Sequence, residues 1–217
     1  RILRTLRWRP ALGGWTNKLG LPNPGIDHLA RLSYDMPDVW ASERIVSLHG
    51  FNASEWYELL DRVKGHGFLG YELNVSCPNV GHLSVPDDLF DRALTIMGPD
   101  RVIVKLPPVS YWETFELAFK SGVRKFHATN TLPAPAGGLS GKALMRVSLD
   151  VVKRIKDAHP EITVIGGGGI TTPVDVVLYK KAGAEHFAVA SVFLNPLRLL
   201  RRETLLAELA WAAGSQV

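Results

Sequence analysis

The chain has 217 residues, of which 46% are hydrophobic, and its formal net charge is +4 at pH 7. This length and apolar content are enough for the core of one domain, and the charge is too small to indicate a nucleic-acid partner. A single cysteine excludes a disulfide framework or a multi-cysteine metal site, and no apolar run has the ~18 residues of a membrane helix, so we expect a cytoplasmic protein without an integral membrane segment.

Basic residues cluster at the start of the chain, where no acidic residue precedes Asp27. The cluster comprises Arg1, Arg4, Arg7, Arg9 and Lys18. We interpret it as a solvated segment, and the alternative is a contact with a phosphate group or an acidic partner.

Six short apolar runs alternate with helical patterns along the rest of the chain. They are rich in β-branched residues and nearly continuous in apolar character, as strands buried on both faces of a parallel sheet are. The predicted strands are residues 45–49, 70–75, 102–106, 123–128, 162–165 and 186–190. Strand–helix repetition of this kind predicts an α/β fold with a parallel sheet.

The segments between these runs carry apolar residues at helical spacing. Two faces are clear, one made by Trp56, Leu59, Leu60 and Val63 and the other by Trp112, Phe115 and Phe119. Residues typical of helix boundaries flank such segments, with Ser110 and Thr172 as candidate N-caps and Gly122 and Gly183 as candidate helix stops.

Polar or glycine-rich residues follow every predicted strand from the second onward. A barrel enzyme builds its site from all its strand ends, whereas a doubly wound open sheet concentrates the site at one switch point. We therefore expect a (β/α)8 TIM barrel forming one domain over residues 1–217. Such a barrel has eight strands and only six are visible here, so we expect that about the first two strand–helix units are missing from the N-terminus.

Four consecutive glycines, residues 166–169, lie between the fifth predicted strand and a helix. Glycines let the backbone approach a ligand closely and expose N–H groups to an anion. With two strands missing, this run follows strand seven and Ala190 and Ser191 follow strand eight, where barrels often hold phosphate. A tight turn would need only one glycine, so we favour phosphate binding. The glycine-rich loop 135–141 is a candidate for further backbone contacts to the same ligand.

Lys105 closes the apolar strand 102–106. If its side chain points inward it should have an anionic partner, because an unpaired buried charge is costly. The alternative is a solvated lysine at a strand end.

Asn17, Asn74, Asn79 and Asn130 lie in loops or at strand ends. Each offers a donor and an acceptor, so together they would suit a planar ring with alternating N–H and C=O groups, although a single asparagine is more often a turn residue.

Cys77 lies between Ser76 and Pro78, just after the second predicted strand. A lone cysteine is usually a small buried hydrophobe, but this position favours a nucleophile or a general base. Of the seven histidines, His49 and His127 lie near strand ends, and we interpret all seven as structural or surface residues.

Six ordered motifs spread over the whole chain resemble the dihydroorotate dehydrogenase family. They are residues 17–25 (Asn-Lys-Leu-Gly-Leu-Pro-Asn-Pro-Gly), 72–80 (Glu-Leu-Asn-Val-Ser-Cys-Pro-Asn-Val), 104–108 (Val-Lys-Leu-Pro-Pro), 129–131 (Thr-Asn-Thr), 137–142 (Gly-Gly-Leu-Ser-Gly-Lys) and 166–170 (Gly-Gly-Gly-Gly-Ile). The resemblance implies an FMN-dependent (β/α)8 barrel that oxidises dihydroorotate to orotate in pyrimidine biosynthesis.

The resemblance also implies roles for individual residues. Cys77 matches the base that removes the C5 proton of the substrate, a cysteine in the soluble class of the family, and Lys105 matches the lysine beside flavin N1 and O2. The implied substrate-binding residues are Asn17, Leu19, Gly20, Leu21, Asn74, Asn79, Asn130 and Thr131. The implied FMN-binding residues are Asn74, Lys105, Gly137, Gly138, Gly168, Gly169, Ala190 and Ser191. Residues 80–86 are a candidate lid over the substrate.

Three features depart from the family pattern. The first two strands of the family are absent, Ala190 and Ser191 replace a common Gly-Thr pair, and the loop between Asn130 and Gly137 is short.

The electron acceptor stays open among fumarate, quinone and a partner flavin/iron–sulfur subunit, and the family often forms homodimers. Two alternatives remain, namely another dihydropyrimidine substrate and a non-catalytic flavin-binding or interaction subunit. The presence of both Cys77 and Lys105 argues against a non-catalytic subunit.

Overall fold

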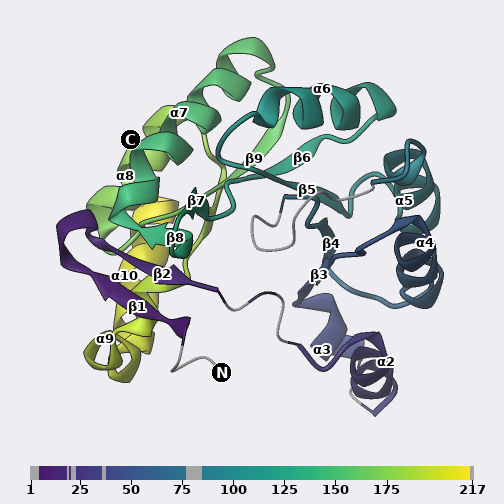
Figure 1. Cartoon of the computed structure of the whole chain (residues 1–217), viewed down its shortest axis with the longest axis horizontal. Helices are drawn as coiled ribbons and strands as arrows, with labels where there is room; N and C mark the ends of the chain where they lie inside the picture. Colours follow the sequence, from purple (N-terminus) through teal and green to yellow (C-terminus); the bar gives the residue numbers. More distant parts are fainter. Residues whose placement is uncertain (1–4, 19, 21–22, 36–37, 77–84, 216–217) are drawn as a thin grey trace.

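The computed structural model describes residues 5–18, 20, 23–35, 38–76 and 85–215. Its main sheet curves along the inner side of a ring of helices, and a second, smaller sheet lies beside the helices at the C-terminal end of the ring (Figure 1). The larger sheet is parallel and the smaller one is antiparallel.

The parallel sheet has six strands in the order β10-β9-β6-β5-β4-β3, so neighbours in space are also neighbours in the chain of β–α units. Its strands are β3 (Ile45–Leu48), β4 (Gly70–Leu73), β5 (Val102–Leu106), β6 (Lys125–Ala128), β9 (Thr163–Gly167) and β10 (His186–Ala188). All six predicted strands are confirmed, with ends within two residues of those expected. The sheet is an open arc of barrel type. Within the residues that the structure describes, no further strand pairs with β3 or β10 at its edges.

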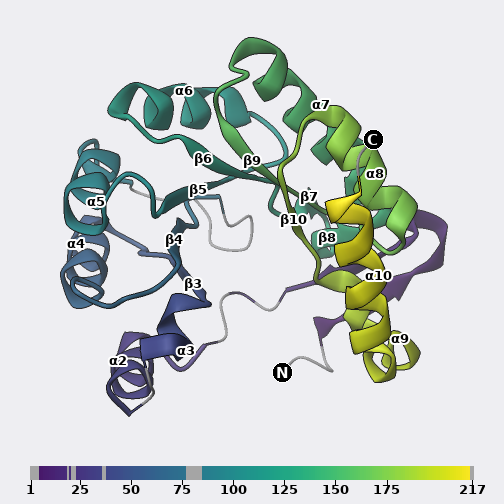
Figure 2. The same cartoon turned by 180° about the vertical axis from the view of Figure 1, so that it is seen from behind.

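Helices cover the outer face of this arc (Figures 1 and 2). They are α4 (Ala53–Arg62), α5 (Leu89–Met97), α6 (Tyr111–Ser121), α7 (Lys142–Ala158), α8 (Pro173–Ala182) and α10 (Arg202–Gly214). Smaller elements complete the chain, namely α2 (Ile26–Asp35), α3 (Asp38–Ser42), α9 (Pro196–Leu200) and the 3-10 turns η1 (Pro10–Leu12) and η2 (Ser191–Leu194). The alternation confirms the predicted α/β barrel architecture.

The core fills the space between the arc and its helices. Its largest fully buried side chains include Trp56, Tyr71, Phe115, Phe126 and Tyr179. Phe115 of α6 and Phe126 of β6 have ring centroids 4.8 Å apart, so the helix face predicted from the spacing of the aromatic residues does pack on the sheet. Burying each such side chain contributes on the order of 1.5–3 kcal/mol relative to leaving it exposed.

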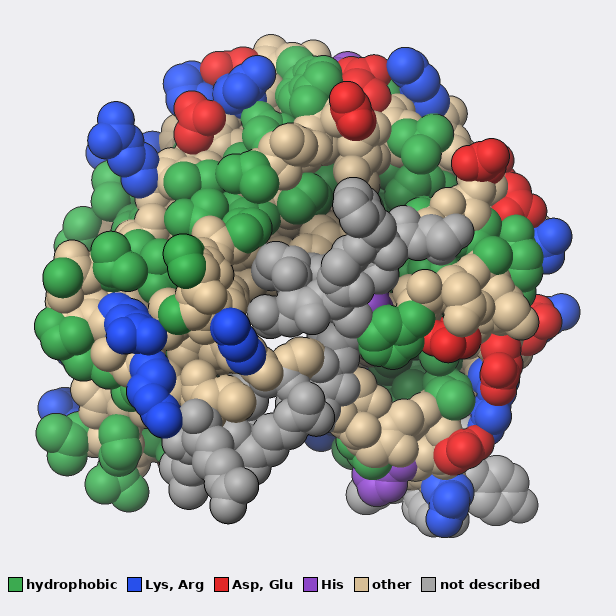
Figure 3. Space-filling model, in the orientation of Figure 1, with side chains coloured by type: hydrophobic (Ala, Val, Ile, Leu, Met, Phe, Trp, Pro, Cys, Tyr) green, Lys and Arg blue, Asp and Glu red, His purple; other side chains and the backbone are tan. Residues whose placement is uncertain are grey.

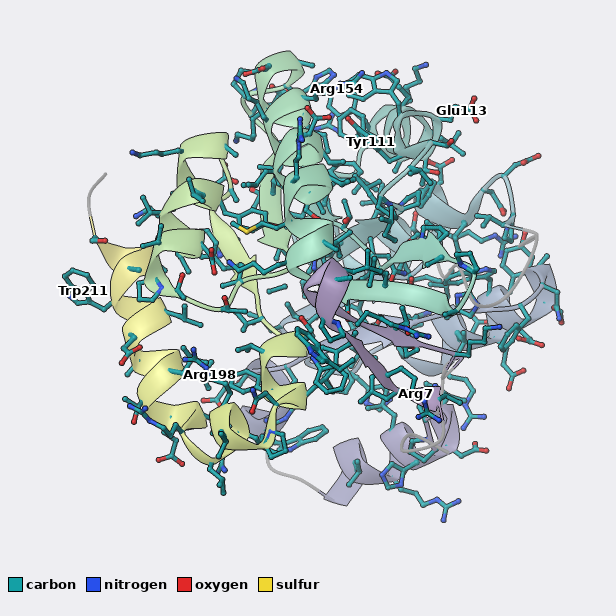
Figure 4. All side chains as sticks on the ribbon, turned by 60° about the vertical axis from the view of Figure 1, so that its left-hand side comes forward. Arg7, Tyr111, Glu113, Arg154, Arg198 and Trp211 are labelled. Atoms are coloured by element: carbon teal, nitrogen blue, oxygen red, sulfur yellow. The ribbon has the colours of Figure 1, made fainter. Side chains whose placement is uncertain are left out.

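Cation–π contacts join neighbouring helices outside the core. The guanidinium of Arg154 on α7 lies 5.9 Å from the ring centroid of Tyr111 and 5.8 Å from that of Trp112, both on α6 (Figure 4). On the other side of the molecule, Trp211 of α10 projects into solvent, where 74% of its surface is exposed.

Helix boundaries follow the predicted residues with one correction. Thr172 caps α8 in a capping box with Asp175, and Gly122 and Gly183 end α6 and α8 in the left-handed conformation. Ser110 precedes α6, as expected, but its φ is +51° and its side chain makes no capping hydrogen bond. An N-cap residue that bonds the helix through its side chain usually has extended backbone, so the prediction of a serine cap was wrong in its chemistry.

The antiparallel sheet was not predicted. It contains β1 (Arg7–Arg9), β2 (Gly14–Asn17), β7 (Leu132–Ala134) and β8 (Gly137–Gly141), in the order β1-β2-β8-β7. The segment expected to be a glycine-rich loop is therefore largely strand β8. Glycine-rich β8 has low intrinsic β-propensity. It forms a strand because it pairs with β2, which lies far away in the sequence.

Gly137 shows how closely these segments pair. Its φ is +108°, and a Cβ there would lie 2.0 Å from the carbonyl oxygen of Asn17. The glycine is therefore required by the approach of β2 to β8, whatever else its backbone contacts.

Charge is unevenly spread over the surface. Lys and Arg side chains gather over the β1–β2 hairpin, and acidic side chains gather over α4 and α5 (Figure 3). Arg7 and Arg9 are both exposed, and Arg9 donates through Nε to the hydroxyl of Thr16 at 3.1 Å. Arg1 and Arg4 lie outside the described residues.

No helix in the described part of the chain is long and apolar enough to span a membrane.

Candidate functional site

A cavity of about 300 Å³ lies at the carboxyl ends of β5, β6, β9 and β10. Lys105 and His127 contribute side chains from β5 and β6, while Gly168 and Gly169 follow β9. Further lining comes from Asn130, Thr131, Ala190 and Ser191. Strand ends converge here because all six strands of the arc are parallel, so polar residues at successive carboxyl ends meet at one edge.

The carboxylate of Glu72 lies at the centre of a polar network inside the arc. Its Oε1 accepts hydrogen bonds from the Ser47 hydroxyl at 2.8 Å and the Lys105 ammonium at 3.3 Å. Its Oε2 accepts one from Nδ1 of His127 at 2.5 Å. Only 8% of Glu72 is exposed, so these partners are what makes a buried carboxylate tolerable.

The network keeps Glu72 ionised. Burial by itself raises the pKa of Glu72, but the hydrogen bond from His127 and the charge of Lys105 outweigh it and lower the pKa to about 2. Burial lowers the pKa of His127 below its ordinary value of 6.5, more than the bond to Glu72 raises it. Near neutral pH the site therefore holds an anionic Glu72 beside a neutral imidazole.

Asn130 joins the ends of β4 and β6. Its Nδ2 donates to Oδ1 of Asn74 at 3.1 Å and to the backbone oxygen and hydroxyl of Ser76 at 3.1 and 3.2 Å. Its Oδ1 accepts from the N–H of Thr131 at 2.8 Å. Two of the four predicted asparagines are thus brought into direct contact.

The glycine run after β9 folds tightly against the start of α7. Gly169 has a φ of +77°, and a Cβ there would lie 2.8 Å from the carbonyl oxygen of Gly141. At the start of α8, the N–H groups of Thr171 and Thr172 donate to the side chain of Asp175 at 2.8 and 2.9 Å. An anion at this end of the cavity would therefore meet the backbone of Gly168 and Gly169 and the Ser191 hydroxyl, because Asp175 already occupies the helix N-terminus.

Residues 7–197 match the family model described as dihydroorotate dehydrogenase. The chain belongs to the dihydroorotate dehydrogenase family. It is 28% identical over 216 residues to the catalytic subunit of dihydroorotate dehydrogenase B (NAD(+)) from Alkaliphilus oremlandii, covering 88% of this chain and 71% of that protein. It is 29% identical over 208 residues to the corresponding subunit from Alkaliphilus metalliredigens, covering 85% and 68% respectively.

A solved structure of the same family shares this fold. The ligand-free dihydroorotate dehydrogenase of Eimeria tenella superposes with a TM-score of 0.69 over 95% of this chain and 73% of its own. Sequence identity between the two is 21%, so the likeness concerns the fold.

Not every residue expected to bind ligand in a dihydroorotate dehydrogenase lies at the cavity. Gly137 and Gly138 lie in β8 and pair with the neighbouring strands of the antiparallel sheet. Asn17 of β2 donates through Nδ2 to the backbone oxygen of Gly138 at 3.4 Å. Asn74 and Gly20 line a separate cavity of about 700 Å³ beside β3. The remaining expected residues, Leu19, Leu21, Cys77, Asn79 and most of the candidate lid 80–86, lie outside the described residues.

Two members of the polar network, Glu72 and His127, were not among the predicted site residues. His127 is not a surface residue, since 12% of its side chain is exposed. A signal was available, because Glu72 and Lys105 are opposite charges inside adjacent buried strands and each requires a partner. The one signal for His127 was its position near a strand end, which it shares with His49.

Proposed function

We propose that this chain binds FMN and oxidises dihydroorotate to orotate. The observation that carries the proposal is Lys105, an ammonium group that lies on the wall of the strand-end cavity and is held there by the buried Glu72 carboxylate. Membership of the dihydroorotate dehydrogenase family supports the same reaction.

The residues at the cavity suit a flavin phosphate. A cationic donor at one side, Lys105, is matched at the other by backbone and hydroxyl donors from Gly168, Gly169 and Ser191. A volume of about 300 Å³ is at the lower end of the range for small-molecule sites. When bound, FMN would supply the acceptor for the hydride of the substrate.

The chain's own residues would perform two tasks. The Lys105 ammonium would stabilise negative charge that develops on a ligand beside it, and the low-dielectric surroundings make such a charge more effective. The thiolate of Cys77 would accept the C5 proton of the substrate, since it follows Ser76, which contacts Asn130 through its backbone oxygen and its hydroxyl. Asn74 and Asn130 would hold the pyrimidine ring.

The electron acceptor would be supplied from outside this chain. The Alkaliphilus relatives are named as catalytic subunits of an NAD(+) enzyme, which supports a partner subunit, and a relative from Pediococcus pentosaceus that is 29% identical is named as a putative fumarate enzyme, which supports fumarate. A homodimer and a cytoplasmic location stay predictions.

The test is reduction of the purified protein, loaded with FMN, by dihydroorotate in the absence of oxygen. The oxidised flavin absorbance should bleach on addition of dihydroorotate, with dihydrouracil as the matched substrate control. Bleaching by dihydrouracil alone would reassign the substrate to another dihydropyrimidine. A folded chain that takes up no FMN would contradict the proposal as a whole.

A further inference from the structure

The two ring nitrogens of His127 face different surroundings. Nδ1 is 2.5 Å from Oε2 of Glu72, inside the arc. Nε2 points toward β9 and the cavity, since a Cβ on Gly167 would lie 3.0 Å from it and His127 lines the cavity wall.

The bond to Glu72 determines which nitrogen carries the proton. An ionised carboxylate can only accept, so Nδ1 must be the donor of this hydrogen bond. Because the imidazole is neutral near pH 7, Nε2 then carries a lone pair and no proton. Within the described part of the chain, the only hydrogen bond of the His127 ring is the one through Nδ1, and no group donates to Nε2.

Lys105 supplies a donor next to this acceptor. Lys105 and His127 are register partners on the adjacent parallel strands β5 and β6, so their side chains leave the same face of the sheet. Both reach Glu72, and both line the same cavity. The wall therefore presents an ammonium donor and an imidazole acceptor side by side.

We propose that Nε2 of His127, oriented by Glu72, is a ligand-binding acceptor that acts together with Lys105 to recognise a ring edge carrying a carbonyl oxygen next to an N–H. The pyrimidine ring of flavin has this edge, with O2 beside N3–H. The inference rests on the proposed function and adds His127 to the FMN-binding residues and Glu72 as the residue that positions it.

Orotate carries the same C=O and N–H pair, so the edge alone does not choose between cofactor and substrate. The position of the pair favours the flavin. His127 lies in the cavity that also contains Gly168, Gly169 and Ser191, the groups available to a phosphate, and orotate has no phosphate. Asn130 lines the same cavity, so the orotate affinity of His127→Asn is measured alongside its FMN affinity.

The tautomer is tested without any ligand. In the full chain labelled with 15N-histidine, the His127 ring should give the neutral Nδ1–H pattern at pH 7, with the His127→Asn spectrum used for assignment. The isosteric Glu72→Gln variant should lose this preference, because an amide can donate as well as accept. A charged ring or an Nε2–H tautomer in the wild-type chain would overturn the inference.

Ligand recognition is tested by two substitutions that separate the two nitrogens. His127→Asn keeps a donor near the Nδ1 position and removes the acceptor, whereas His127→Gln can place an amide oxygen near the Nε2 position. FMN affinity, measured by fluorescence quenching, should fall about tenfold or more in His127→Asn, the usual cost of leaving a buried N–H unpaired, and less in His127→Gln. His186→Asn is the matched control and should bind FMN as the wild type does, since His186 is exposed at the start of β10 and lies outside this cavity.

A modified cofactor separates recognition from general damage to the fold. FMN methylated at N3 has no donor there, so the wild type should bind it about tenfold more weakly than FMN, and His127→Asn should bind both alike. Equal affinity of the wild type for the two flavins would overturn this inference alone. Loss of orotate affinity with unchanged FMN affinity in His127→Asn would also overturn it. A wild-type chain that binds no FMN would instead contradict the proposed function.

Discussion

At the scale of single residues, the polar side chains at the strand ends are held by one another. Lys105 is fixed by Glu72, and Asn130 is fixed by Asn74 and Ser76. Ordering long side chains costs conformational entropy. Here the side chains are already ordered when the chain folds, before any ligand binds. A ligand that enters the cavity would meet donors already in position, which is what electrostatic catalysis requires.

Cys77 is the residue whose substitution should separate binding from chemistry. Cys77→Ala removes the proposed base but none of the residues expected to bind FMN, so FMN should be retained. Reduction of the flavin by dihydroorotate at neutral pH should slow by roughly 100-fold or more, the usual contribution of a general base. Stopped-flow absorbance under anaerobic conditions measures this rate, and an unchanged rate would exclude Cys77 from the mechanism.

At the scale of secondary-structure elements, the start of α8 shows how the glycine run is anchored. The carboxylate of Asp175 accepts from the backbone of Thr171 and Thr172, from the Thr171 hydroxyl at 3.0 Å, and from the ammonium of Lys142. Burial raises the pKa of Asp175, but the bond from Lys142 and the backbone donors lower it overall. One side chain thus ties the helix to the preceding loop and to α7.

Removing this cap should destabilise the protein measurably. Asp175→Ala leaves the two backbone N–H groups just before α8 and a lysine without their acceptor, at an expected cost of about 1–3 kcal/mol in the free energy of unfolding. The control is Asp157→Ala, which removes an exposed pair with Lys153 at 3.0 Å and should change stability by less than about 0.5 kcal/mol. Urea unfolding followed by circular dichroism compares the two, and equal losses would contradict the structural role of Asp175.

At the scale of the whole molecule, Glu72 links four consecutive strands. Ser47, Glu72, Lys105 and His127 lie on β3, β4, β5 and β6 respectively. The network therefore spans most of the arc, and its protonation should be felt as a change in global stability.

Acid should destabilise the fold through this network. Glu72 binds its proton near pH 4.5 when unfolded but only near pH 2 when folded, so its contribution is present above about pH 4.5 and is lost as the pH falls toward 2. The loss amounts to roughly 3 kcal/mol when complete. Because burial lowers the pKa of His127 in the folded chain, the unfolded chain binds this proton at higher pH than the folded chain does, and this adds to the loss.

Unfolding free energies measured by urea between pH 7 and pH 3 check this expectation. They should decrease with falling pH in the wild type, and the slope below pH 4.5 should be smaller in Glu72→Gln, which has no carboxylate to protonate. Parallel slopes for the two proteins would show that Glu72 is not the group responsible.

The amino-acid sequence predicted the six parallel strands, the helix faces of Trp56 and Phe115, and the family motifs. Periodicity and local chemistry act over a few residues, so such features need no knowledge of distant contacts. The edge strands β3 and β10 are not buried on both faces as their apolar sequences suggested, because no further strand covers them in the described residues. The antiparallel sheet, the contact of Asn74 with Asn130, and the link from Glu72 to His127 were decided only in three dimensions. The pairing of β2 with β8 and the two side-chain contacts join residues 55 or more positions apart. A buried charge requires a partner, but the sequence does not identify which residue that partner is.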